Sequence, residues 1–156
     1  MDAAKVLVMR HAEKPDDPLD PDLSEAGRDR AQKLARYIPV TFGKPKFLFA
    51  TTMSKHSRRP IETLEPLAME CNVDMDTSFA DQDYGALAHT LRNTPRYNGA
   101  LIVVCWHHGN IPSLAHALKA NAGDYPDPWD PSVFNLILQF DFVRGVPTVH
   151  RVIEPF

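Results

Sequence analysis

The chain has 156 residues, of which 44% are hydrophobic and 24% are charged, and its formal net charge is −3. This composition is ordinary for a globular protein with a substantial core, and it excludes disordered, collagen-like and disulfide-scaffold classes. The acidic balance argues against a nucleic-acid partner, because proteins that bind nucleic acid by general electrostatic attraction are usually basic. We therefore expect one domain over residues 1–156.

The two cysteines, Cys71 and Cys105, lie in apolar runs and form no Cys-x-x-Cys motif. Such cysteines are typical of buried, reduced thiols in a cytosolic protein. No stretch reaches the roughly 18 apolar residues of a membrane span. The apolar run Val6–Met9 is too short for the core of a signal peptide. The sequence thus predicts a cytoplasmic protein with no membrane anchor and no membrane partner.

The chain begins with a short strand and an amphipathic helix. Lys5–Met9 is a short, apolar, β-rich run. Ser24 is placed to cap a helix that runs to about Ile38, since apolar residues recur there on one face. Pro39 should end that helix, because a proline inside a helix removes a hydrogen bond and clashes with the preceding turn.

A second strand and helix follow. Phe47–Ala50 predicts a strand, and residues 57–70 predict a helix. Pro60 suits the first turn of that helix, whereas Pro66 should kink or break it. Residues 73–75 predict a further short strand.

The second half of the chain continues the alternation and ends in a hairpin. The run Ala100–Trp106 is continuously apolar, as central parallel strands are. The prolines and glycine of residues 121–131 predict a loop, and residues 144–147 predict the turn of a hairpin. The remaining predicted elements are helices over 81–92 and 111–120 and strands over 133–143 and 148–153.

Strands that alternate with helices predict an α/β fold. We expect a three-layer sandwich with a mostly parallel central sheet and an antiparallel C-terminal strand or hairpin. Ligands of such sheets bind beyond the carboxyl ends of the strands. The residues that directly follow each predicted strand are therefore the candidate site residues.

Cations, histidines and carboxylates follow four of the predicted strands. We expect them to converge at one edge of the sheet and to serve phosphoryl transfer. Arginine binds phosphate through two parallel hydrogen bonds, histidine can accept a phosphoryl group, and a carboxylic acid can protonate the leaving oxygen. In chain order these residues are Arg10, His11, Arg58, Arg59, Asp81, Asp83, His107 and His108.

Four segments resemble the histidine phosphatase superfamily, also called the phosphoglycerate mutase-like family, over nearly the whole chain. Val8–Lys14 resembles the Arg-His-Gly signature. Leu23–Gly27 resembles the Leu-Thr-x-x-Gly opening of the first helix. Arg59–Thr63 resembles an Arg-Ala-x-Gln-Thr segment, and Val103–Asn110 resembles the segment that carries a second histidine. The compact chain is similar to the branch that includes the small bacterial phosphohistidine phosphatases.

The resemblance implies roles for the phosphate-binding residues. His11 matches the histidine that is phosphorylated, and Arg10 matches the arginine beside it. Arg59 matches the second arginine, because it lies four residues before Thr63. His108 matches the second pocket histidine and, with Gly109, would bind phosphate.

Three neighbouring residues have less defined roles. His107 is one residue away from the match and would flank the pocket or pack beside the strand. Arg58 is either a further phosphate ligand or a solvated neighbour of Arg59. Lys14 lies where a phytase-like branch carries another arginine, and it is either a phosphate contact or a solvated lysine. The signature glycine is replaced by Ala12.

The proton donor is expected among two aspartates. Residues 81–87 resemble the mutase segment Glu-Arg-His-Tyr-Gly-x-Leu, and Asp81 takes the place of the glutamate. Aspartate is one methylene shorter, so Asp83 is the alternative donor. Both aspartates would also suit the N-terminal turn of a helix without any catalytic role.

The resemblance implies a metal-independent phosphatase without a cofactor, acting on a phosphorylated small molecule or a phosphoprotein through a phosphohistidine at His11. Zinc is disfavoured because two arginines at the same place oppose a divalent cation. Two alternatives stay open, namely an inactive phosphate- or phosphopeptide-binding module and a phosphoglycerate mutase-type transferase. The sequence indicates neither the physiological substrate nor the oligomeric state.

Overall fold

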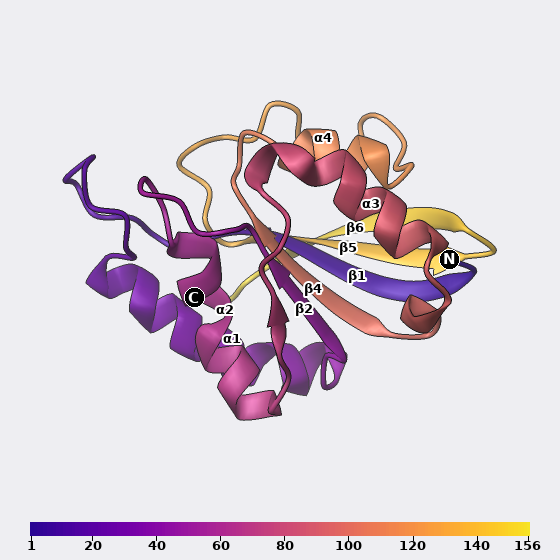
Figure 1. Ribbon diagram of the computed structural model, residues 1–156, viewed down its shortest axis with the longest axis horizontal. Helices are drawn as coiled ribbons and strands as arrows, with labels where there is room; N and C mark the ends of the chain where they lie inside the picture. Colours follow the sequence, from indigo (N-terminus) through magenta and orange to yellow (C-terminus); the bar gives the residue numbers. More distant parts are fainter.

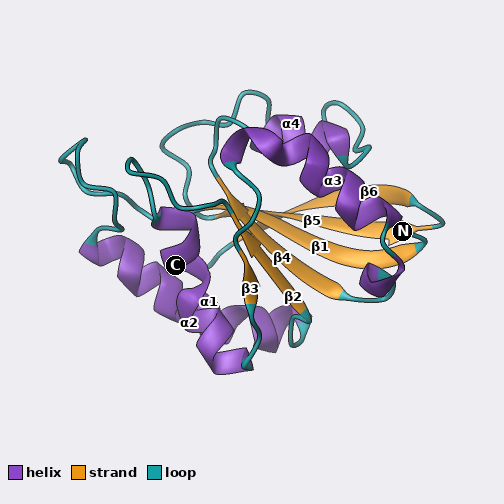
Figure 2. Cartoon of the chain, viewed as in Figure 1, coloured by secondary structure: helices purple, strands orange, loops and turns teal.

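The computed structural model describes residues 1–156 and contains one six-stranded sheet in the order β3-β2-β4-β1-β5-β6 (Figure 2). β1, β2, β3 and β4 run parallel to one another, whereas β5 is antiparallel to β1 and forms a hairpin with β6. The mostly parallel α/β sheet with its antiparallel C-terminal hairpin confirms the predicted fold class. The strands are β1 (Ala3–Arg10), β2 (Phe47–Ala50), β3 (Met75–Asp76), β4 (Leu101–Trp106), β5 (Leu136–Val143) and β6 (Val146–Ile153).

Four α-helices cover the two faces of the sheet, which makes three layers (Figure 1). α1 and α2 pack on one face, where Leu34 and Leu64 join a cluster with Leu7 of β1. α3 and α4 pack on the other face, against alternate residues of the same strands. The helices are α1 (Glu25–Phe42), α2 (Arg59–Cys71), α3 (Tyr84–Asn93) and α4 (Ile111–Ala117), with short 3₁₀ turns at Asp81–Asp83 and Pro95–Tyr97. None of them is long and apolar enough to cross a membrane.

Neither proline interrupts its helix as predicted. α1 continues through Pro39 to Phe42, and α2 continues through Pro66 without a break. In α1 the ring of Phe42 packs against that of Tyr37, with centroids 6.0 Å apart, and this contact stabilises one further turn. Tertiary contacts of this kind outweigh the loss of a single backbone hydrogen bond at a proline.

The predicted strand over 133–143 begins later, at Leu136. The carbonyl of Val133 accepts a hydrogen bond from the indole of Trp129 at 3.1 Å and is 3.4 Å from Nη1 of Arg10. Because these side chains occupy that carbonyl, residues 133–135 belong to the loop that follows α4. That loop therefore reaches over the end of β1.

A close approach of α1 to the segment after β1 requires glycine at position 27. A Cβ atom there would lie 2.3 Å from the carbonyl oxygen of Glu13. The same carbonyl accepts hydrogen bonds from the backbone N–H of Ser24 at 3.0 Å and from its hydroxyl at 3.2 Å. Ser24 also caps α1 by accepting from the N–H of Gly27, so the first turn of α1 fixes the chain directly after His11.

Gly27→Ala should destabilise the protein by about 1–3 kcal/mol, because the added methyl group overpacks a backbone contact that cannot yield. Gly85→Ala is the matched control. A Cβ at Gly85 of α3 meets no atom within 4 Å, and alanine there should stabilise the helix by about 1 kcal/mol. Urea unfolding of both variants measures the two effects, and equal stabilities would contradict the assigned contact.

Candidate active site

A pocket of about 570 Å³ lies at the carboxyl ends of β1, β2 and β4. It collects side chains from the segments that follow β1, β2, β3 and β4, as expected for a sheet of this topology. A larger hollow between α1 and α2 is lined by mixed charges and contains no histidine. The pocket residues are Arg10, His11, Lys14, Thr52, Met53, Ser54, His56, Ser57, Arg59, Ala80, Asp81, Gln82, His107, His108 and Gly109.

His11 lies at the base of this pocket, directly after β1, and is 3% exposed. Its Nδ1 is 2.6 Å from the carbonyl oxygen of Ala12. A carbonyl only accepts, so Nδ1 carries the proton and Nε2 of the neutral ring keeps its lone pair. Burial, together with the nearby His107, Arg10 and Arg59, lowers the pKa of His11 to about 3, against the opposing hydrogen bond to Ala12. The ring is therefore neutral and able to attack through Nε2.

One hydroxyl group, that of Thr63 in α2, fixes the segment that follows His11. Thr63 accepts a hydrogen bond from the N–H of Ala12 at 2.9 Å and donates to the carbonyl of Arg59 at 2.7 Å. Both bonds are buried, where leaving either partner unsatisfied would be costly. The spacing of Arg59 and Thr63 thus serves both the arginine and the nucleophile.

Arg10 is 2% exposed, and the loop before β5 fixes its guanidinium. Nη1 donates to the carbonyl of Pro131 at 2.6 Å, and the ring of Phe134 lies 3.9 Å from Cζ. Nε is buried and has no hydrogen-bond partner in the protein. Burial and the proximity of Arg59 lower the pKa of Arg10 to about 10, so it remains charged at neutral pH. A buried cation with a free N–H favours an anionic ligand.

Arg59, at the start of α2, supplies the second cation. It is 9% exposed, its Nε donates to the carbonyl of Asp22 at 3.1 Å, and its Nη2 donates to the carbonyl of Asp20. Neither Arg59 nor Arg10 forms an ion pair with a carboxylate. Two buried guanidinium groups without an ion-pair partner favour a doubly charged ligand such as phosphate.

Both histidines after β4 line the pocket, but His107 is the one that contacts His11. Their ring centroids are 5.3 Å apart, and Nε2 of His107 is 3.4 Å from the hydroxyl of Thr51. Burial lowers the pKa of His107, and also that of His108. In the sequence, the position directly before Gly109 favours His108 over His107. The signal for His107 was the pairing of β1 with β4: Arg10 lies opposite Trp106, so the next residues, His11 and His107, are also level.

The two candidate acids lie in different surroundings. Asp81 lines the pocket, and its Oδ1 is buried without a hydrogen-bond partner. Its backbone carbonyl accepts from the indole of Trp106 at 3.0 Å and from Asn110 at 3.4 Å. Asp83 is exposed, does not line the pocket, and accepts a hydrogen bond from the N–H of Ala80 at 3.3 Å. Of the two carboxylates, only Asp81 lines the pocket.

Of the remaining predicted residues, some line the pocket and one does not. Lys14 and Gly109 line the pocket, and Lys14 is exposed at its mouth. Arg58 points away, because Nη2 forms an ion pair with Asp22 at 2.7 Å. No three histidine, cysteine or carboxylate side chains are grouped so that they could hold a metal ion.

Comparison with solved structures shows that the chain has the fold of the histidine phosphatase superfamily. No family model matches the sequence, and no curated protein matches it in sequence. The protein histidine phosphatase SixA, solved with tungstate, superposes with a TM-score of 0.67 at 17% identity over 96% of both chains. Small SixA phosphohistidine phosphatases recur among the similar structures.

Two other similar structures come from different members of the superfamily. A phosphoserine phosphatase mutant from Entamoeba histolytica, in complex with phosphoserine, has a TM-score of 0.63 at 13% identity and covers 94% of each chain. A phosphoglycerate mutase from Plasmodium falciparum has a TM-score of 0.66 at 12% identity, over 96% of this chain and 90% of the mutase. Because these identities are low, the comparisons establish the fold alone.

The ring of His11 should stay neutral down to about pH 4, because its pKa lies near 3. Unfolding restores a pKa near 6.5, so between about pH 3 and 6.5 the unfolded chain binds a proton at His11 that the folded chain does not bind. His11 should therefore reduce stability as the pH falls below 6.5, by up to about 1.4 kcal/mol per pH unit. NMR titration of the ring nitrogens, with the urea-unfolded chain as the reference, checks this. Protonation of His11 near pH 6.5 in the folded protein would contradict the assignment.

Proposed function

We propose that the protein is a metal-independent phosphatase that hydrolyses phosphomonoesters or phosphohistidine through a phosphohistidine intermediate on His11. The observation that carries the proposal is the buried, neutral His11 with a free Nε2, set between two arginines that lack carboxylate partners. The superfamily fold supports it, since similar structures include phosphatases of phosphohistidine and phosphoserine.

The first step transfers the phosphoryl group to the enzyme. The lone pair of His11 Nε2 forms a bond to phosphorus while the bond from phosphorus to the leaving group breaks. Arg10 and Arg59 neutralise the charge on the phosphoryl oxygens, and His107 with His108 can donate hydrogen bonds to them. Asp81, in its protonated form, gives its proton to the leaving oxygen of a phosphomonoester or to the leaving ring nitrogen of a phosphohistidine.

The second step returns the enzyme to its starting state. A water molecule attacks phosphorus, the bond between phosphorus and Nε2 breaks, and the Asp81 carboxylate accepts the proton of the water. Inorganic phosphate leaves. The hydrogen bond from His11 Nδ1 to the carbonyl of Ala12 persists through both steps and holds the ring in one orientation.

His11→Ala should abolish the release of phosphate from p-nitrophenyl phosphate without unfolding the protein, because it removes the nucleophile. The loss should exceed about 1,000-fold, as expected for a residue that forms the covalent intermediate. His89→Ala is the control, since His89 is exposed on α3 and does not line the pocket. Near wild-type hydrolysis by His11→Ala would overturn the covalent mechanism. Binding of phosphate without any turnover by the wild-type protein would indicate a binding module.

Asp81→Asn should slow the hydrolysis of alkyl phosphates about 100-fold or more, because their poor leaving groups need a proton. The same change should affect p-nitrophenyl phosphate little, since p-nitrophenolate leaves without help. Asp83→Asn is the matched control, two residues away and outside the pocket. Steady-state kinetics with both substrates decide the matter. A selective loss in Asp83→Asn instead would assign the acid to Asp83.

A further inference from the structure

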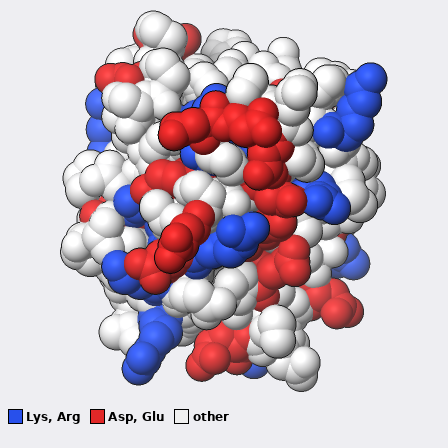
Figure 3. Space-filling view, turned by 90° about the vertical axis from the view of Figure 1, so that its left-hand side faces the viewer, with Lys and Arg blue, Asp and Glu red and all other residues white.

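Three segments near the cationic pocket contain carboxylates that lie outside its lining. The loop after β1 contains Asp16, Asp17 and Asp20, the segment before α3 contains Asp83, and the loop before β5 contains Asp127 and Asp130. We call these six residues the acidic rim. Figure 3 looks at the end of the molecule from which the loop after β1 projects, and acidic side chains form a ridge across it beside fewer basic ones.

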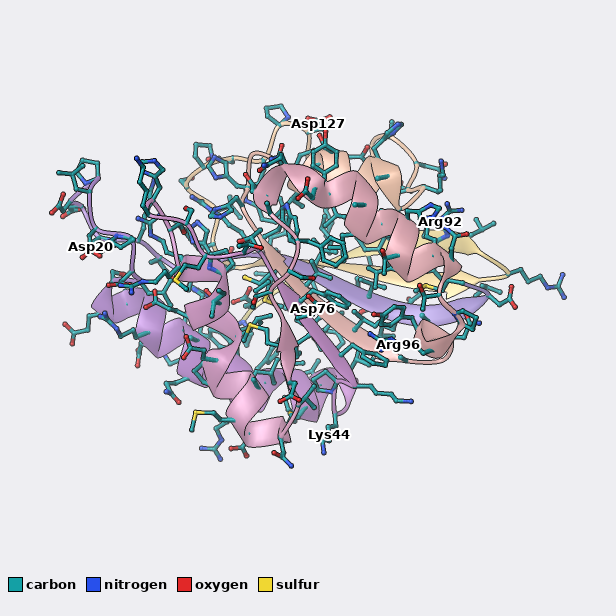
Figure 4. The ribbon with its side chains drawn as sticks, viewed as in Figure 1. Asp20, Lys44, Asp76, Arg92, Arg96 and Asp127 are labelled. Carbon is teal, nitrogen blue, oxygen red and sulfur yellow. The ribbon has the colours of Figure 1, made fainter.

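Contacts of the two buried arginines place the rim beside the pocket. Arg59 donates to the backbone carbonyl of Asp20, which belongs to the loop after β1. Arg10 donates to the carbonyl of Pro131, the neighbour of Asp130 in the loop before β5. Figure 4 shows Asp20 on the projecting loop after β1 and Asp127 in the loop above α4, far from Asp20. The rim therefore flanks the phosphate-binding groups on separate sides.

The rim carboxylates are free to act on a ligand. None of the six forms an ion pair, and only Asp20 among them is half-buried rather than exposed. Their hydrogen bonds are local, as where Asp17 accepts from the N–H of Leu19 and Asp130 accepts from Ser132. In contrast, Asp22 of the same loop is neutralised by Arg58.

The pocket itself holds the evidence for a ligand. Arg10 is almost completely buried, lines the pocket and keeps an Nε without a partner, so the centre of this surface attracts an anion. The six rim carboxylates outnumber Lys14, the exposed lysine at the mouth of the pocket. An excess of negative charge beside an anion site repels a ligand that is anionic throughout. The same negative charge attracts a ligand in which positive charges flank a phosphoryl group.

We propose that the substrate is a phosphorylated protein segment with lysine or arginine residues on both sides of the phosphorylated residue. This inference rests on the proposed function and narrows its substrate class. A small aminoalkyl phosphate could meet only one side of the rim, whereas an extended peptide across the pocket meets both. The rim also disfavours polyphosphorylated and acidic substrates, because each added negative charge faces several carboxylates.

The test compares two peptides with one central phosphohistidine, flanked on both sides by either lysines or glutamates. We expect kcat/KM for the lysine peptide to be about 10-fold or more higher at low ionic strength, where surface charges act over tens of ångströms. The ratio should shrink toward one in 0.5 M salt. p-Nitrophenyl phosphate serves as the common substrate without flanking charges.

A charge-neutralised variant attributes the preference to the rim. The triple variant Asp16→Asn, Asp17→Asn and Asp130→Asn should reduce the ratio of the two peptides at least 3-fold, and amides preserve the local hydrogen-bond acceptors. The matched control is Asp2→Asn, Glu70→Gln and Asp74→Asn, which removes the same number of exposed charges at the opposite edge of the sheet. This control should leave the ratio unchanged.

The outcomes separate the two proposals. Hydrolysis of p-nitrophenyl phosphate with equal or reversed use of the peptides, or with no use of either, overturns the basic-segment substrate and leaves the phosphatase intact. If nothing is hydrolysed, the proposed function fails, and fluorescence anisotropy of the same labelled peptides then tests the rim through binding. Equal affinities for the two peptides would overturn the inference in that case as well.

Discussion

The site depends on the hydroxyl of Thr63, which joins two backbone segments that are distant in the sequence. It accepts from the N–H of Ala12 and donates to the carbonyl of Arg59, and the threonine is fully buried. One side chain thereby sets the distance between the nucleophile and the start of α2. Since both partners are backbone groups, the restraint does not depend on the rotamers of His11 or Arg59, and catalytic groups need such restraint to keep a productive geometry.

Burial and the two neighbouring guanidinium groups act in the same direction on His11. Burial makes a protonated His11 costly, and the guanidinium groups of Arg10 and Arg59 increase that cost. The same guanidinium groups form no ion pair with a carboxylate of the protein. An arriving phosphoryl group would relieve their repulsion while it meets an imidazole that is already unprotonated. Preorganisation of this kind removes reorganisation from the chemical step.

The succession of strands and helices along the chain could be anticipated, because hydrophobic periodicity distinguishes an amphipathic helix from a buried strand. Residues next to the strand ends could be anticipated too, since a parallel sheet gathers them at one edge. The predictions that Pro39 ends its helix and that Pro66 breaks its helix were wrong, because local propensity does not report packing against neighbouring elements. The contact of His107 with His11 was missed because a motif match ignores the register between two strands.

The groups that hydrogen-bond or ion-pair with the site residues could not be predicted from the sequence. Nothing local indicates that the carbonyl of Pro131 holds Arg10, or that Arg58 turns toward Asp22 while its neighbour enters the pocket. These contacts span long separations in the chain and depend on loop conformations. Turn-forming residues mark where a loop lies, but they do not determine which of its carbonyl groups face inward.

The contacts of Arg10 with the loop before β5 limit how this scaffold can diversify. The guanidinium is held by the carbonyl of Pro131 and the ring of Phe134, which lie more than 120 residues further along the chain. Grafting a different loop between α4 and β5 would therefore also release Arg10. A graft that replaces the tip and keeps residues 131–134 would leave Arg10 in place, and it marks the boundary at which this loop can be exchanged.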